Sequence, residues 1–163
     1  MFESRERLAD DIRHLLAAVR HEAGGRYACL MEPGRILFES PEPEEREEWA
    51  LRRLLEERSA ALFSLPGSMA AEGPAEDVFE GWEHDDFLLA FVNGRVALAV
   101  ACPDAEAVRD AVMRPLRALA DRLFRYNETW RLDEKGRGFF VGSARLDVVT
   151  GFDQESHNLA RHR

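Results

Sequence analysis

His84, Asp85 and Asp86 form the local group of side chains with the clearest chemical potential in this sequence. Imidazole and carboxylate groups transfer protons near neutral pH and bind divalent cations. A metal site needs three or four ligands that converge on one point, whereas consecutive residues of an extended chain point in alternating directions. We therefore interpret this group as a polar turn between two strands, and we predict no metal-ligating residue.

Other reactive residue types occur in patterns that favour structural roles. His14 and His21 can share a helix face, but no carboxylate or cysteine motif accompanies them. The glutamates of residues 43–65 are typical of a solvated helix face rather than of paired catalytic carboxylates. Cys29 and Cys102 lie in apolar, strand-like runs, where a reduced cysteine packs as a small hydrophobic side chain. Since the sequence also lacks a phosphate-binding loop and a Gly-x-Ser-x-Gly motif, we predict no catalytic residue and no cofactor.

Composition and charge restrict the classes of function. Of the 163 residues, 45% are hydrophobic and 33% are charged, which is enough apolar material for a core beneath a charged surface. The formal net charge of -9 disfavours nucleic acid and anionic membrane as partners, because both are polyanions. The sequence has no apolar run of about 18 residues and begins without the features of a signal peptide. We therefore expect a cytoplasmic protein that does not insert into membranes.

The spacing of apolar residues predicts three helices and five strands. Helical spacing occurs at residues 4–23, 43–65 and 104–126, and strand-like runs occur at 26–31, 35–39, 77–83, 87–92 and 95–102. Pro33-Gly34 and Asn93-Gly94 are typical of hairpin turns. Residues 66–77, which are rich in Gly, Pro and Ala, predict a loop.

These elements predict a single domain of the α/β (α+β) class in residues 1–126, in the order α-β-β-α-β-β-β-α, with an extension at 127–163. The runs 87–92 and 96–101 are almost continuously apolar, which indicates central strands covered on both faces. The run 77–83 alternates more and is expected at a sheet edge. The predicted fold is a five-stranded, mainly antiparallel sheet with helices on both faces, plus a C-terminal tail.

Several sequence features occur together in the order of a known family. They are Gly24-Gly25 before Arg26–Met31, the Pro33-Gly34 hairpin, and Phe87–Gly94 before the last strand. With the element order, these features make residues 4–126 resemble the roadblock/LC7 family. Members of that family usually form homodimers, and many regulate or scaffold small Ras-like GTPases or motor complexes.

The resemblance implies where an interface lies in this chain. Roadblock dimers pair their third strands edge to edge and pack their second helices together. The matching positions here are Val78, Phe79 and Trp82 in the strand 77–83, and Trp49 and Arg53 in the second helix. Tryptophan is enriched at interface anchors, and an uncovered strand edge invites a partner strand.

The C-terminal extension contains two apolar clusters that an idle linker would not need. Residues Phe139, Phe140, Val141, Leu146 and Val148 carry this pattern, and they predict a strand within 138–149. We expect this strand to join its own domain, the dimer mate or a partner. The last residues, 153–163, are predicted to be disordered.

These features together predict a homodimeric adaptor, scaffold or regulator that is not an enzyme. Its expected partners are a second copy of itself and another protein, such as a small Ras-like GTPase or a larger assembly. The alternative is a GAF-like small-molecule sensor, because GAF and profilin-like domains share much of this layout. A sensor needs a polar-lined pocket between sheet and helix, and the uniformly apolar central strands favour the adaptor.

Overall fold

The computed structural model of the protein describes residues 4–65, 78–126 and 144–150. Four helices and five strands lie within these ranges. They are, in chain order, α1 (Arg5–Glu22), β1 (Tyr27–Glu32), β2 (Arg35–Ser40), α2 (Arg46–Glu57), α3 (Ser59–Leu62), β3 (Asp86–Val92), β4 (Val96–Cys102), α4 (Ala105–Tyr126) and β5 (Leu146–Val149).

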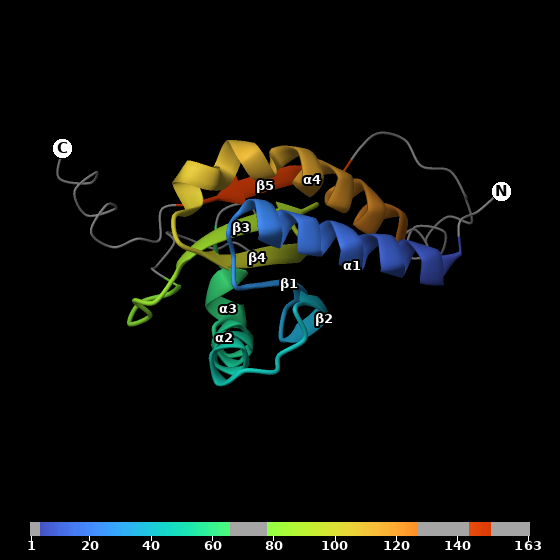
Figure 1. The fold of residues 1–163 in the computed structure, drawn as a ribbon. Helices are drawn as coiled ribbons and strands as arrows, with labels where there is room; N and C mark the ends of the chain where they lie inside the picture. Colours follow the sequence, from blue (N-terminus) through green and yellow to red (C-terminus); the bar gives the residue numbers. More distant parts are fainter. Residues whose placement is uncertain (1–3, 66–77, 127–143, 151–163) are drawn as a thin grey trace.

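The five strands form one antiparallel sheet in the order β2-β1-β4-β3-β5. Helices α1 and α4 cover one face of the sheet, and α2 and α3 lie on the other (Figure 1). All seven residues of β4 are buried, as a strand covered on both faces requires. The predicted class, a five-stranded antiparallel sheet with helices on both faces, is confirmed.

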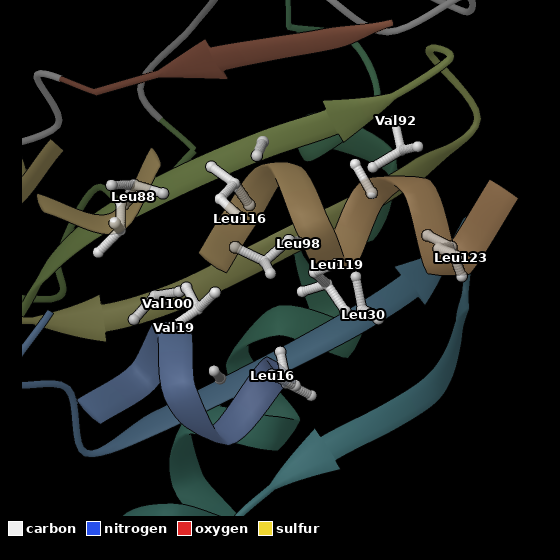
Figure 2. Packing of buried hydrophobic residues seen from close by; sticks show 14 of the residues in the cluster. Leu16, Val19, Leu30, Leu88, Val92, Leu98, Val100, Leu116, Leu119 and Leu123 are labelled. Atoms are coloured by element: carbon white, nitrogen blue, oxygen red, sulfur yellow. The ribbon is translucent and has the colours of Figure 1, made fainter. Parts of the chain in front are cut away.

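Each face of the sheet has its own hydrophobic core. Leu16 and Val19 of α1 meet Leu116 and Leu119 of α4 above Leu98 of the sheet, in what we term the α1/α4 core (Figure 2). The opposite α2/α3 core contains, among others, Tyr27, Cys29, Met31, Leu51, Leu55, Leu62, Phe87, Leu89 and Phe91. Because side chains alternate along a strand, successive residues of β3 enter different cores.

The hairpin between β3 and β4 has the predicted turn. Asn93 and Gly94 both adopt positive φ, at 53° and 68°. Residues 93–95 connect Val92 to its partner Val96, and asparagine and glycine are the residues that tolerate positive φ best. Asn93-Gly94 therefore sets the register in which β3 pairs with β4 over its whole length.

The prediction of an edge strand at residues 77–83 is wrong. Residues 78–81 form a turn, and Asp77 lies outside the described residues. The strand next to β3 is instead β5, which comes from the C-terminal extension. The element order of the described residues is therefore α-β-β-α-α-β-β-α-β, with the fifth strand after α4.

The turn forms because its apolar residues are buried together. Val78 and Phe79 are adjacent, yet both lie in the α2/α3 core, whereas adjacent residues of a strand point to opposite faces. Phe79 stacks on Phe87 with ring centroids 3.8 Å apart. Arg58 donates hydrogen bonds of 3.2 Å to the carbonyl oxygens of Val78 and Glu80, which satisfies backbone groups that a neighbouring strand would otherwise pair.

The second predicted helix, at 43–65, begins later than expected and is divided into α2 and α3. Its helical turns begin at Arg46, and Arg58 separates α2 from α3. In the C-terminal extension, the strand predicted within 138–149 is observed at Leu146–Val149 and joins its own domain. Phe139, Phe140, Val141 and the predicted disordered segment 153–163 lie outside the described residues.

Candidate protein-binding face of α2

Helix α2 lies on the sheet with one apolar face and turns a charged face outward. Its start is stabilised by the Glu48 carboxylate, which accepts a 3.1 Å hydrogen bond from the backbone N–H of Glu45. Leu51, Leu54 and Leu55 are buried in the α2/α3 core. Because these leucines face the sheet, the residues on the opposite side of the helix lie on the outer surface.

The outer face of α2 carries an exposed tryptophan. The side chain of Trp49 is 52% exposed, and it is the one exposed large hydrophobic side chain among the described residues. It belongs to an outer stripe with helical spacing, formed by Arg46, Trp49, Ala50, Arg53 and Glu57, which borders an open surface depression. An exposed tryptophan flanked by arginines is the composition typical of interface anchors.

Arg52 connects this outer face to the sheet. Its guanidinium carbon lies 5.5 Å from the centroid of the Trp49 ring. Nη1 of Arg52 is 3.5 Å from Glu39 of β2, and Nε is 3.3 Å from Glu56, as an ion pair without hydrogen-bond geometry. Two carboxylates thus hold Arg52 against the indole, which restricts the tryptophan before any partner arrives.

The two arginines of the outer stripe, Arg46 and Arg53, differ from Arg52 in their surroundings. Within the described part of the chain, neither Arg46 nor Arg53 has an ion pair or a hydrogen bond through its guanidinium. Both side chains are exposed. The outer face of α2 therefore presents an aromatic ring between two arginines that have no ion-pair partner among the described residues, on a chain whose net charge is -9.

A polar cluster lies under Arg52. Tyr27 donates a 2.6 Å hydrogen bond to Glu39, the carboxylate that also faces Arg52. Burial, reinforced by Cys29 and Glu39, raises the pKa of Tyr27 far above its ordinary value, and burial raises the pKa of the Cys29 thiol to about 12. Both groups therefore remain protonated at neutral pH, where an effective nucleophile would be ionised. The role that this cluster has in the structure is to hold the Glu39 carboxylate beside Arg52.

The histidine and aspartates at 84–86 do not converge. Asp85 lies 3.1 Å from Nε of Arg26 and accepts a 3.2 Å hydrogen bond from Trp82. Asp86 accepts hydrogen bonds from its neighbour Phe87 and from the backbone N–H of Ala105 at the start of α4, at 2.9 and 2.7 Å. No group of three metal-ligating side chains occurs within residues 4–65, 78–126 and 144–150.

The remaining reactive residue types also have structural partners. Nδ1 of His14 lies 2.8 Å from the carbonyl oxygen of Asp10, to which it donates from within the same helix. Cys29 and Cys102 are free and buried in different cores, on opposite faces of the sheet. No helix in the described ranges has the length and apolarity needed to cross a bilayer.

The structure separates the five residues predicted for an interface. Trp49 and Arg53 lie side by side on the outer stripe of α2. Val78 and Phe79 are buried within the monomer, at 2% and 3% exposure, so they cannot contribute a pairing edge. Trp82 is half-buried, with its indole N–H bonded to Asp85. The edge predicted at 77–83 is thus not an interface strand.

Sequence reasoning missed other residues of these surfaces. Arg46 and Glu57 complete the outer stripe of α2, and their spacing from Trp49 was a readable signal. Asn93 and Arg117 bind the segment around β5, and no sequence pattern connects them with it. The predicted contact residues Leu146 and Val148 are half-buried and pack against the α1/α4 core.

Comparison with known proteins yields no match to any family model, and no curated protein or solved structure matches the chain.

Proposed function

We propose that this chain is a non-catalytic adaptor or regulator that binds other proteins and forms a homodimer through the outer face of α2. The observation that carries the proposal is the exposed Trp49, which contacts Arg52 and lies between Arg46 and Arg53, two arginines without an ion pair in the part of the chain that the structure describes. Such a face loses water-exposed apolar area on binding and supplies cations for a partner's carboxylates. The resemblance to roadblock domains, which pack their second helices together, supports the same face.

The outer stripe of α2 is self-complementary in charge. Arg46 and Glu57 lie near its two ends, with Ala50 and Arg53 at equal distances from its centre. If two copies pack α2 antiparallel around a two-fold axis, each Arg46 faces the other copy's Glu57. The same symmetry sets each Trp49 near the other copy's Arg53, in reach of a cation–π contact. The small Ala50 lets the helices approach closely.

The test is the solution mass measured by light scattering on the wild-type protein and on charge-exchange variants. We expect the wild type at twice the chain mass of 18.6 kDa and Trp49→Glu as a folded monomer. Arg46→Glu alone and Glu57→Arg alone place like charges together, so each weakens the dimer. The double variant restores opposite charges and the dimer. A monomeric wild type, or a double variant no better than the single ones, contradicts the proposal.

The second partner we propose is a small Ras-like GTPase or a larger assembly, on the strength of the family resemblance. The checking measurement is binding of the dimer to a purified Ras-like GTPase loaded either with GDP or with a GTP analogue. Nucleotide-dependent affinity supports a regulatory role, and equal absence of binding in both states removes the GTPase from the proposal. A cytoplasmic site of action is part of the same proposal, since both cysteines are free.

A further inference from the structure

The outer edge of β3 is a strand-binding surface that the chain fills with a distant segment of itself. β3 has seven residues, six of them fully apolar and buried, and β5 pairs with the last four. Residues 78–85, which precede β3 directly, do not pair with this edge, and residues 78–81 form a turn. An uncovered edge of such apolar composition would pair with another chain.

Within the described ranges, residues 144–150 form hydrogen bonds with groups at this edge and on α4. Asn93 and Arg145 exchange two hydrogen bonds, of 2.8 and 2.7 Å, beside the β3–β4 turn. Arg117 binds the carbonyl oxygen of Ala144, and Glu106 accepts a hydrogen bond from Thr150. These partners come from the β3–β4 hairpin and α4, so a second copy of the chain presents the same set.

Side-chain packing adds specificity to this pairing. Leu146 and Val148 pack against the α1/α4 core, and Val149 packs against the α2/α3 core. Asp147 lies between them and pairs with Arg145 at 3.0 Å. A segment that fits here needs apolar side chains on both faces and polar groups at each end, and residues 144–150 are the segment shown to fit.

We propose that two copies of this chain exchange residues 144–150, each inserting its β5 beside the β3 of the other. The segment is separated from the end of α4 by residues 127–143, a length of 17 residues, which spans up to about 60 Å when extended. The contacts that the segment makes with the β3–β4 hairpin and α4 are reproduced in the exchanged arrangement, so exchange exploits an existing interface. This second interface goes beyond the proposed α2 dimer and does not depend on it.

The register of the strands provides a direct test. The backbone N–H of Asn93 donates to the carbonyl oxygen of Arg145, so the alternation of an antiparallel ladder makes Ala90 and Val148 a non-hydrogen-bonded pair. The Cα atoms of such a pair are about 4.5 Å apart, within the range of about 4.4 to 6.8 Å that a disulfide bridges. Cysteines at these two positions therefore crosslink when the strands pair.

The experiment places the two cysteines on different molecules. Ala90→Cys and Val148→Cys are made separately in a chain carrying Cys29→Ala and Cys102→Ala, then mixed in an oxidised and reduced glutathione buffer. We expect a disulfide-linked heterodimer on non-reducing gels, at least about tenfold more abundant than in the control, because pairing raises the effective thiol concentration. The matched control replaces Val148→Cys with Arg109→Cys on the exposed side of α4.

Two further measurements make each outcome decisive. The double variant with both cysteines in one chain reports whether the engineered pair forms at all, and circular dichroism verifies folding. If that variant closes within single chains while the mixture stays at the control level, exchange is refuted. Repeating the mixture with Trp49→Glu separates the two interfaces, since loss of the α2 dimer with retained crosslinking supports exchange alone. Loss of crosslinking in that background also refutes exchange as an independent interface.

Discussion

Nη1 of Arg117, on α4, donates a 2.6 Å hydrogen bond to the carbonyl oxygen of Ala144, just before β5. The arginine is half-buried, and its acceptor belongs to a segment 27 residues further along the chain. Helix α4 thus covers the sheet with its apolar face and also holds the last strand in register through a polar side chain. This contact makes the position of β5 sensitive to one residue outside the sheet.

Arg117→Ala is expected to loosen β5 more than the rest of the sheet. Loss of a charge-assisted hydrogen bond at a half-buried position costs about 1 to 2 kcal/mol of unfolding free energy. Because the contact is local, hydrogen exchange at the amides of Asp147 and Val149, which face β3, should accelerate while exchange in β4 changes less. Arg114→Ala, at an exposed position of the same helix, serves as the control. Uniform acceleration across the sheet would contradict a local role for Arg117.

Gly25→Ala is expected to destabilise the protein more than Gly24→Ala. A Cβ at Gly25 would lie 2.9 Å from the carbonyl oxygen of Ala101 and from a methyl group of Val100, and the oxygen belongs to backbone that cannot move freely. Overpacking of this kind costs about 1 to 3 kcal/mol.

Substitution of Gly24 measures the cost of an unfavourable backbone conformation separately from the cost of a steric clash. Its φ is +64°, with nothing within 4 Å of an added Cβ, so Gly24→Ala suffers only the left-handed backbone penalty, about 1 kcal/mol. Urea unfolding of both variants compares the two costs. A larger loss for Gly24→Ala would show that the junction between α1 and β1 relaxes around a side chain at residue 25.

Alkaline pH is expected to destabilise the fold through its two cysteines. Burial raises the pKa of Cys29 and of Cys102 from an ordinary value of 9.0 to about 12. Between these values the unfolded chain releases thiol protons that the folded chain retains, so folded-state stability is full below pH 9 and falls as pH rises toward 12. The slope approaches about 1.4 kcal/mol per pH unit for each thiol.

The measurement is the urea midpoint at about pH 8 and about pH 10, a window that brackets the unfolded thiol pKa. Cys29→Ala with Cys102→Ala provides the matched control and should lose most of the decrease. The part that remains is assigned to Tyr27, whose pKa burial also raises. An identical decrease in wild type and double variant would show that other groups cause the alkaline loss.

Local patterns in the sequence were sufficient for much of the sheet. The apolar runs around Leu89 and Leu98 predicted central strands covered on both faces, and Asn93-Gly94 predicted the turn between them. These features depend on neighbouring residues, because alternation, propensity and turn geometry act over a few positions. For the same reason the helical stripes of α1 and α4 were readable without a structure.

The prediction of a strand at 77–83 failed because the local alternation of apolar and polar residues does not show which distant side chains contact this segment. Phe79 stacks on Phe87, and Arg58 takes up the backbone carbonyl oxygens of the turn, both through tertiary contacts. The exposed position of Trp49 was equally hidden, since a tryptophan on a charged helix fits either a core or a surface.

The sequence by itself determined the class of this protein, its central hairpin and the charged, solvated face of its second helix. Only the tertiary structure decided which segment covers the edge of β3, and therefore which surfaces remain for a partner. The physical reason is that strand pairing joins residues far apart in the chain. Asn93 and Arg145 are 52 positions apart, and no local period connects them.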